Sequence, residues 1–168
     1  MMKQIGKLLL LAVLVVLVTT GCKESKKYDV TNTKGYSVED LSFEVPAILE
    51  YNKGSSNDSK KQFSSYLNNE KDYCYMFVAV KEGSSSSDLQ KTIYTGLDRS
   101  DSIDYSHKTI NGEDWTTGYS SSVKSLKYYL YAIYHNNKLY EFSYRGSGTG
   151  DICTKIFKVV EKSLKFNQ

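Results

Sequence analysis

The spacing of apolar and polar side chains predicts a β-rich domain in the second half of the chain. Strand-like runs flank Asn111-Gly112 and Asn136-Asn137, and both pairs suit two-residue turns whose residues take positive φ. In the second hairpin the implied register places Tyr131 opposite Phe142, within a ladder of aromatic residues typical of a core. Because strands joined by such short turns must run antiparallel, residues 104–145 are predicted to form a four-stranded meander.

Further strand signals lie closer to the N-terminus. Alternating apolar residues that stop at Pro46 indicate one strand within residues 36–45. Residues 62–67 and 73–80 are two more strand-like runs, and the second is apolar on both faces, as expected of a central strand. The polar stretch between residues 52 and 61 has no periodicity and is predicted to be a loop.

Spacings of three and four residues indicate two helices. The first opens with Ser87 and Gln90, which match a capping box. Its buried stripe is predicted to comprise Leu89, Ile93 and Leu97. The second helix begins at Thr149 or Asp151. Its apolar face is predicted to comprise Ile152, Ile156, Val159, Val160 and Ser163.

The N-terminal segment has the pattern of a signal peptide. Two lysines precede an apolar run at residues 8–18, whose eleven residues fall short of the about 20 that cross a bilayer. Residues 17–22, Leu-Val-Thr-Thr-Gly-Cys, resemble the lipobox of bacterial lipoproteins. That resemblance implies cleavage between Gly21 and Cys22 and a diacylglycerol thioether on the Cys22 sulfur. An uncleaved N-terminal anchor helix is the alternative interpretation.

These features divide the chain into three parts. Residues 1–21 form the signal peptide, residues 22–35 the lipidated cysteine and a flexible tether, and residues 36–168 a single domain. The tether contains lysines that suit anionic lipid headgroups, although its acidic residues also suit a solvated linker. The anchored domain is expected outside the cytoplasm, on the outer surface of the cytoplasmic membrane.

The charge balance argues against nucleic acid as a partner. The full chain carries 22 basic and 19 acidic residues, and removal of the signal peptide takes away two lysines, leaving 22 − 2 = 20 basic residues. A nearly neutral domain has no electrostatic reason to bind a polyanion.

Two cysteines lie in the predicted domain, Cys74 and Cys153. They are 153 − 74 = 79 positions apart and form no C-x-x-C motif, so neither redox catalysis nor zinc binding is indicated. An extracytoplasmic location permits a disulfide between them. Two separate buried thiols are the alternative, because free cysteine is among the residues most often buried.

No arrangement of residues matches a catalytic or metal site. His107 and His135 are the only histidines, and the predicted register gives His107 one acidic neighbour, Asp114, a diagonal step away. The acidic stretch at residues 98–104 lacks the glycine of a calcium loop, and the glycines at residues 146–150 lack the lysine of a P-loop. The sequence therefore predicts no catalytic residue, metal or cofactor.

The chain has 15 tyrosines, and most fall on predicted strands, so sheet core is the plainer interpretation. On the face opposite the aromatic ladder, Tyr128, Tyr134 and Arg145 form a candidate contact patch, because Tyr and Arg are enriched in interface hot spots. A second layer of helix over that face would bury the patch instead. In the first hairpin Lys108 lies opposite Trp115, where its aliphatic stem can cover the ring.

The order of the elements resembles the PsbP-like fold. A strand ending in Phe43-Glu44-Val45-Pro46 precedes a polar loop, a hydrophobic strand, a capped helix, the meander with Asn111-Gly112 and a closing helix that ends at residues 159–166. The resemblance covers residues 36–167 and implies an α+β fold, an α/β/α sandwich whose central antiparallel sheet is flanked by two main helices. Small bacterial lipoproteins and extrinsic photosystem subunits share this fold. It has no common catalytic residue, so the resemblance implies no mechanism.

The sequence favours a non-enzymatic lipoprotein that binds a protein partner or a component of the cell envelope. A small-ligand receptor or chaperone-like subunit is the first alternative, with a tyrosine-lined pocket between sheet and helix. The second is a hydrolase, which needs a serine or cysteine beside His107 or His135.

Overall fold

Most of the described chain lies in two antiparallel β-sheets. The computed structural model describes residues 28–67, 72–82, 88–97, 103–123, 126–147 and 151–167. The larger sheet has seven strands, in the order β3 (Glu50–Tyr51), β4 (Lys60–Leu67), β5 (Asp72–Glu82), β9 (Lys138–Ser147), β8 (Leu126–His135), β7 (Glu113–Val123) and β6 (Asp104–Ile110). The smaller sheet has three strands, in the order β1 (Thr33–Val38), β2 (Leu41–Pro46) and β10 (Lys165–Phe166).

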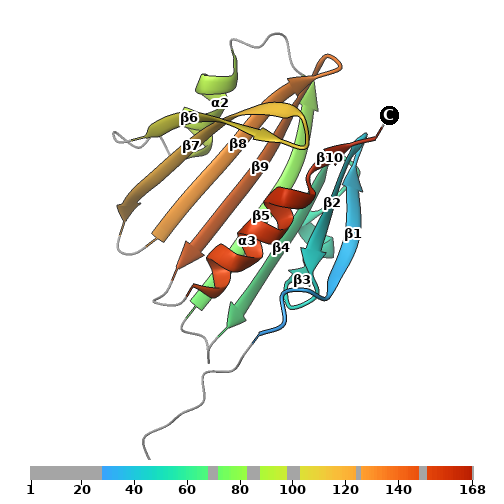
Figure 1. Ribbon diagram of the computed structural model, residues 1–168, viewed down its shortest axis with the longest axis vertical. Helices are drawn as coiled ribbons and strands as arrows, with labels where there is room; N and C mark the ends of the chain where they lie inside the picture. Colours follow the sequence, from blue (N-terminus) through green and yellow to red (C-terminus); the bar gives the residue numbers. More distant parts are fainter. Residues whose placement is uncertain are drawn as a thin grey trace, which may run out of the picture.

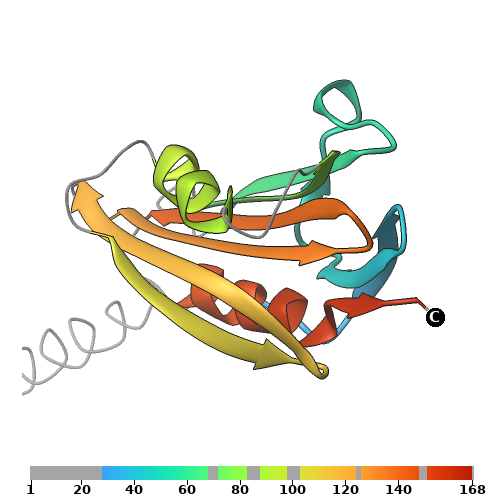
Figure 2. The same cartoon turned by 90° about the horizontal axis from the view of Figure 1, so that it is seen from above.

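Two α-helices lie on opposite faces of the large sheet (Figures 1 and 2). On one face α2 (Asp88–Gly96) packs on β7 and β8. On the other, α3 (Ile152–Ser163) lies beside β2 and leads directly into β10. A single 3-10 turn, η1 (Lys53–Ser55), precedes β4. No helix of the described residues is long and apolar enough to span a bilayer.

The predicted meander and its registers are confirmed. Asn111, Gly112, Asn136 and Asn137 all have positive φ, as two-residue hairpin turns require. Both predicted registers are observed. Lys108 pairs with Trp115 in the first hairpin, and the aromatic ladder pairs as expected in the second. Turn chemistry alone was therefore enough to align β6 with β7 and β8 with β9.

The strand-like runs at residues 62–67 and 73–80 are confirmed as β4 and β5, which pair antiparallel, and β5 lies in the interior of the sheet between β4 and β9. Only one face of β5 is fully covered along its length. Cys74, Met76 and Val78 are buried there, whereas Tyr73 and Tyr75 on the other face are half-buried.

The predicted α/β/α sandwich is wrong. One face of the large sheet is covered by α3 and the three-stranded sheet together, rather than by helix alone (Figure 2). The other face is covered only in part, because α2 packs on residues of β7 to β9 such as Leu130, Ala132 and Leu139. The chain is mostly β, with a second sheet in the place where the prediction put only helix.

The second sheet was missed because its hairpin carries no turn signal. Residues 36–45 were predicted as one strand, but β1 and β2 are joined by a turn at Glu39 and Asp40. Glu39 takes a φ of 53°, a conformation for which sequence patterns point to Asn or Gly. The third strand, β10, pairs with β2 across most of the chain length, and no local pattern reports such a pairing.

Two contacts hold helix α3 against the large sheet, one in the middle of the helix and one in its first turn. The ring of Phe157 contacts four aromatic rings of β8 and β9, those of Tyr129, Tyr131, Phe142 and Tyr144. In the first turn, Cys153 forms a disulfide with Cys74 of β5, with Cα atoms 5.4 Å apart. The two cysteines are thus one bridge rather than two separate thiols.

The buried stripe is right for one helix and shifted for the other. In α2, Ile93 and Leu97 are buried and Leu89 packs beside them, as predicted. In α3 the predicted stripe includes Ile152 and Val159, which are only partly buried, so the helix face that is buried lies slightly to one side of the predicted one. The residues buried are Cys153, Ile156, Phe157, Val160 and Glu161.

The packed domain begins earlier than the predicted boundary. Tyr28 and Val30 pack against the core, and β1 starts at Thr33, within the stretch assigned to the tether. The predicted signal peptide, the cleavage site at Gly21 and Cys22, and the helix cap at Ser87 lie outside the described residues.

Close packing of α2 depends on the absence of a side chain at Gly118 of β7. A methyl group there would overlap Ile93 and contact Leu97. We expect Gly118→Ala to lower the free energy of unfolding by about 1–3 kcal/mol, as overpacked cores do. Gly35→Ala is the matched control, because nothing lies within 4 Å of a methyl group added there. Urea unfolding midpoints measure both, and equal midpoints would contradict the packing.

Candidate interaction surface

The large sheet leaves an aromatic face beside α2. We define this aromatic face as the side chains of Tyr66, Tyr73, Tyr75, Phe77, Tyr128 and Arg145, from β4, β5, β8 and β9. Tyr66 is 67% exposed, and the others are half-buried. Because the alternation of β-strands sends these residues away from the main core, the face belongs to the surface.

The strand registers bring the aromatic face together. Tyr75 lies directly opposite Arg145, which lies directly opposite Tyr128, so the three form one row across β5, β9 and β8. The rings of Tyr66 and Tyr73 approach to 4.6 Å in the neighbouring row. Such cross-strand pairs fix the positions of side chains that would otherwise be mobile on a surface.

Two cations lie over rings of this surface. The Arg145 guanidinium lies 4.1 Å from the ring centre of Tyr128, and the Lys60 ammonium lies 4.9 Å from that of Phe77. Both distances suit cation–π attraction. Burial raises the pKa of Tyr75, and the positive charge of Arg145 partly offsets that effect. Tyr75 therefore keeps its proton at neutral pH and can donate a hydrogen bond.

Two of the three residues predicted for a contact patch lie in this face. Tyr128 and Arg145 are neighbours, as the predicted register required. Tyr134 lies six residues farther along β8, about 20 Å away at the rise of a strand, and its hydroxyl is 3.4 Å from Asn137 Oδ1. The sequence pattern missed Tyr73 and Tyr75, because nothing local indicates that β5 pairs with β9.

The histidines occupy separate surface positions. His107 Nδ1 is 3.3 Å from Asp114 Oδ2, the neighbour predicted from the register, and both side chains are 66% exposed. His135 stacks on Phe166 with 3.9 Å between ring centres. Within the described residues no serine or cysteine hydrogen-bonds to either imidazole, and no group of three His, Cys, Asp or Glu could hold a metal ion.

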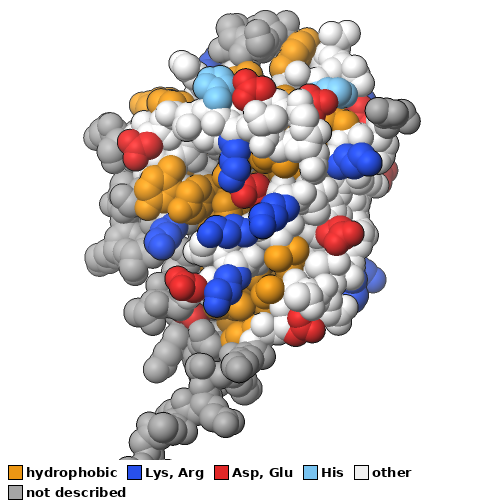
Figure 3. Space-filling model, in the orientation of Figure 1, with side chains coloured by type: hydrophobic (Ala, Val, Ile, Leu, Met, Phe, Trp, Pro, Cys, Tyr) orange, Lys and Arg blue, Asp and Glu red, His pale blue; other side chains and the backbone are white. Residues whose placement is uncertain are grey.

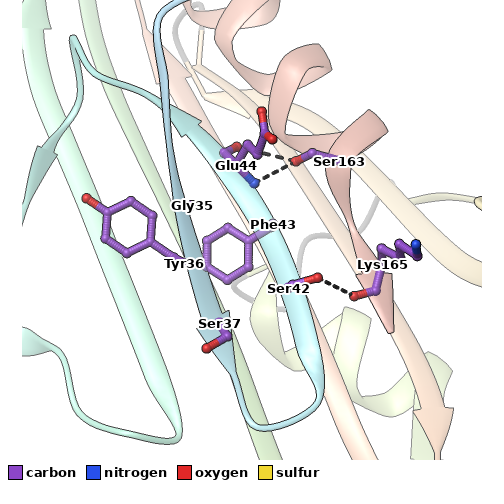
Figure 4. Close-up of a pocket in the computed structure, with 8 residues that line it drawn as sticks. All are labelled: Gly35, Tyr36, Ser37, Ser42, Phe43, Glu44, Ser163 and Lys165. Carbon is purple, nitrogen blue, oxygen red and sulfur yellow. Dashed lines mark hydrogen bonds between the residues drawn. The ribbon is translucent and has the colours of Figure 1, made fainter. Parts of the chain in front are cut away.

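A cleft of about 550 Å³ opens on the small sheet, beside the end of α3 (Figure 4). It is lined by Gly35, Tyr36, Ser37, Ser42, Phe43, Glu44, Ser163 and Lys165. The hydroxyls of Ser42 and Ser163 already form hydrogen bonds within the protein. The backbone N–H of Glu44 donates to Ser163 Oγ at 2.8 Å, and Ser42 Oγ donates to the Lys165 carbonyl at 2.9 Å. These bonds join β2 to α3 and β10.

The space predicted for a tyrosine-lined pocket, between α3 and the large sheet, is filled by Phe157 and its neighbours. The same interface contains a carboxylate that sequence analysis missed. Glu161 is 4% exposed, and its Oε1 accepts hydrogen bonds from Tyr131 at 2.5 Å and Lys108 at 2.7 Å. The Lys108 amine is thus bound to α3. This shared oxygen ties α3 to β6 and β8.

Comparison with known proteins rests on structure alone. No family model and no curated protein matches the sequence. The cyanobacterial PsbP protein of Synechocystis sp. PCC 6803 (CyanoP) has a TM-score of 0.56 at 15% identity, over 88% of this chain and 98% of its own. The fold is PsbP-like.

A second similar structure comes from Bacteroides thetaiotaomicron, with a TM-score of 0.52 at 16% identity over 82% of this chain. The match covers 48% of that protein, so this chain spans about half its length. Identities this low show the shared PsbP-like fold and nothing of function.

Three buried tyrosines predict a loss of stability at high pH. Burial raises the pKa of Tyr131, Tyr140 and Tyr144, and carboxylates bonded to the first two add to the effect. In the unfolded chain these groups ionise at about pH 10. Above that pH the folded state holds more protons than the unfolded state, so the free energy of unfolding falls as pH rises.

Urea unfolding between about pH 8 and about pH 11 measures the effect, with a slope of up to about 1.4 kcal/mol per pH unit for each tyrosine above pH 10. We expect Tyr131→Phe to reduce that slope, since one of the groups whose pKa is raised on folding is gone. Tyr105→Phe, at a residue that is 44% exposed, should leave the slope unchanged. An identical slope in the Tyr131 variant would contradict the interpretation.

Proposed function

We propose that this protein is a non-enzymatic bacterial lipoprotein, anchored through Cys22 to the outer surface of the cytoplasmic membrane, which binds a partner at that surface. The lipobox at residues 17–22 supports the anchor. The observation that carries the location is the Cys74–Cys153 disulfide, because thiols in the cytoplasm are kept reduced. The bridge is independent of the signal sequence, so two features support one location.

The aromatic face is the proposed binding surface. Tyr and Arg are enriched in the hot spots of protein interfaces. Here Tyr75 and Arg145 are held in one row by their strands, so binding would order them little further. The partner is a protein or a component of the cell envelope held at the same membrane, since the anchor keeps the domain close to it.

Photo-crosslinking in the producing cells tests both halves of the proposal. A photoreactive phenylalanine analogue replaces Tyr66 in the aromatic face, or one of two other exposed tyrosines elsewhere, Tyr94 and Tyr105. We expect a discrete adduct from position 66 and none from positions 94 and 105. Arg145→Ala should lower the affinity for the partner about thirtyfold and so weaken the adduct, because truncating an interface hot spot costs about 2 kcal/mol or more.

Membrane fractionation of the same cells tests the lipid anchor. The parent protein should fractionate with membranes, and Cys22→Ala should leave them and lose the adduct, because it removes the lipidated sulfur. Equal adducts from all three positions would contradict the aromatic face as the binding surface. A Cys22→Ala variant that stays in the membrane fraction would contradict the lipid anchor.

A further inference from the structure

The outward side of α3 carries a row of lysines. Lys155, Lys158 and Lys162 are exposed, and their spacing of three and four residues places them on one stripe of the helix. Lys165, also exposed, follows in β10. The opposite side of α3 carries Phe157 into the core. Figure 3 shows Lys and Arg side chains gathered over the middle of this face of the molecule.

Acidic residues near α3 do not neutralise this lysine row. Glu161 is buried and already bound by Lys108 and Tyr131. Glu44 lies at the edge of the row, and its Oε2 accepts a hydrogen bond from Thr33 at 2.8 Å. Among the residues that the structure describes, none of the four lysines forms an ion pair. The domain as a whole is close to neutral, whereas the lysine row carries four positive charges.

The chain enters the domain in the same layer as the lysine row. The described chain begins at Tyr28, 28 − 22 = 6 positions after Cys22, which is at most about 21 Å of extended chain. It leads into β1, and β1, β2 and β10 form one sheet that continues from α3. Figure 2 shows α3 and this sheet in one layer, on the side of the large sheet opposite to α2.

We propose that the lysine row, made of Lys155, Lys158 and Lys162 of α3 and Lys165 of β10, lies against the anionic headgroups of the bilayer that holds the protein. This inference rests on the proposed lipid anchor at Cys22. Lysine amines are attracted to an anionic leaflet only within about one Debye length, about 8 Å at physiological salt. The short connection from Cys22 keeps the domain close enough for that contact, and the row decides which side faces the membrane.

The proposed orientation has a consequence for the aromatic face. The lysine row and the aromatic face lie on opposite sides of the large sheet. With the row against the bilayer, Tyr66 and Tyr75 point away from the membrane, where a partner can reach them. The apolar side of α3 is buried in the core. The contact with lipid is therefore electrostatic, and no apolar side of the helix enters the bilayer.

Amine labelling tests the orientation without any substitution. The lipidated protein, extracted from its own membranes, is reconstituted into vesicles of phosphatidylcholine alone or of phosphatidylcholine with phosphatidylglycerol. Acetylation of each lysine is then followed by mass spectrometry. We expect Lys155, Lys158 and Lys162 to react severalfold more slowly on the anionic vesicles. Lys91, exposed on α2 in the opposite layer, is the internal control and should react equally on both.

Changes in salt concentration and lipid composition test whether the protection is electrostatic. At about 1 M salt the Debye length falls to about 3 Å, so the protection should disappear. Equal acetylation of the three lysines on both kinds of vesicle overturns the proposal. Protection in native membranes but not on phosphatidylglycerol vesicles also overturns it, and indicates an acidic protein partner instead.

Failure of the anchor gives a different result. If mass spectrometry finds no lipid on Cys22, the proposed anchor fails, and the full chain is coupled through the Cys22 thiol to maleimide lipid in the same vesicles. Cys74 and Cys153 are bridged and do not compete for the reagent. Slower acetylation of the lysine row on anionic vesicles then supports the lysine surface by itself, and equal acetylation overturns it.

Discussion

The attachment of α3 to the large sheet is the interaction on which the rest of this fold depends. The helix is fixed at its start by the Cys74–Cys153 disulfide, in its middle by the stacking of Phe157, and near its end by Glu161. With α3 in place, the residues that follow it reach β2 and complete the small sheet. Without that attachment, one face of the large sheet would lose most of its cover.

The two faces of the large sheet are therefore unequal. One is closed by α3 and the small sheet, and its aromatic residues form the main core. Within the part of the chain that the structure describes, the other face carries only α2, a helix of nine residues, and the row of Tyr75, Arg145 and Tyr128 lies at the surface. Burying aromatic area is strongly favourable, so a face that keeps it half-exposed is suited to contact with another molecule.

The same asymmetry gives the domain two surfaces of different chemistry. Lysines lie on the outward side of α3, and aromatic residues lie on the far side of the sheet. A protein tethered near its N-terminus gains from such an arrangement, because one surface can meet the membrane while the other stays accessible. The carboxylate of Glu161, buried under α3, holds the helix in place.

Hairpin turns could be predicted from the sequence, whereas the pairing of strands far apart in the chain could not. Asn111-Gly112 and Asn136-Asn137 fixed two hairpins and, with them, the contact of Tyr128 with Arg145. The turn at Glu39 carries no such residue, so the small sheet and the layer it forms were missed. Tyr75 joined the aromatic face only through the pairing of β5 with β9, about 70 residues apart in the chain, for which no local pattern exists.

We propose that this domain folds outside the cytoplasm around an α3 held by a disulfide, and that a lipid on Cys22 anchors it to the membrane. The most direct measurement is peptide mass mapping, without reduction, of the protein isolated from its own cells. The account predicts that the peptide with Cys74 is linked to the peptide with Cys153, and that the chain begins at a Cys22 carrying diacylglycerol. Free thiols at all three cysteines, on a chain that still begins at Met1, would contradict it.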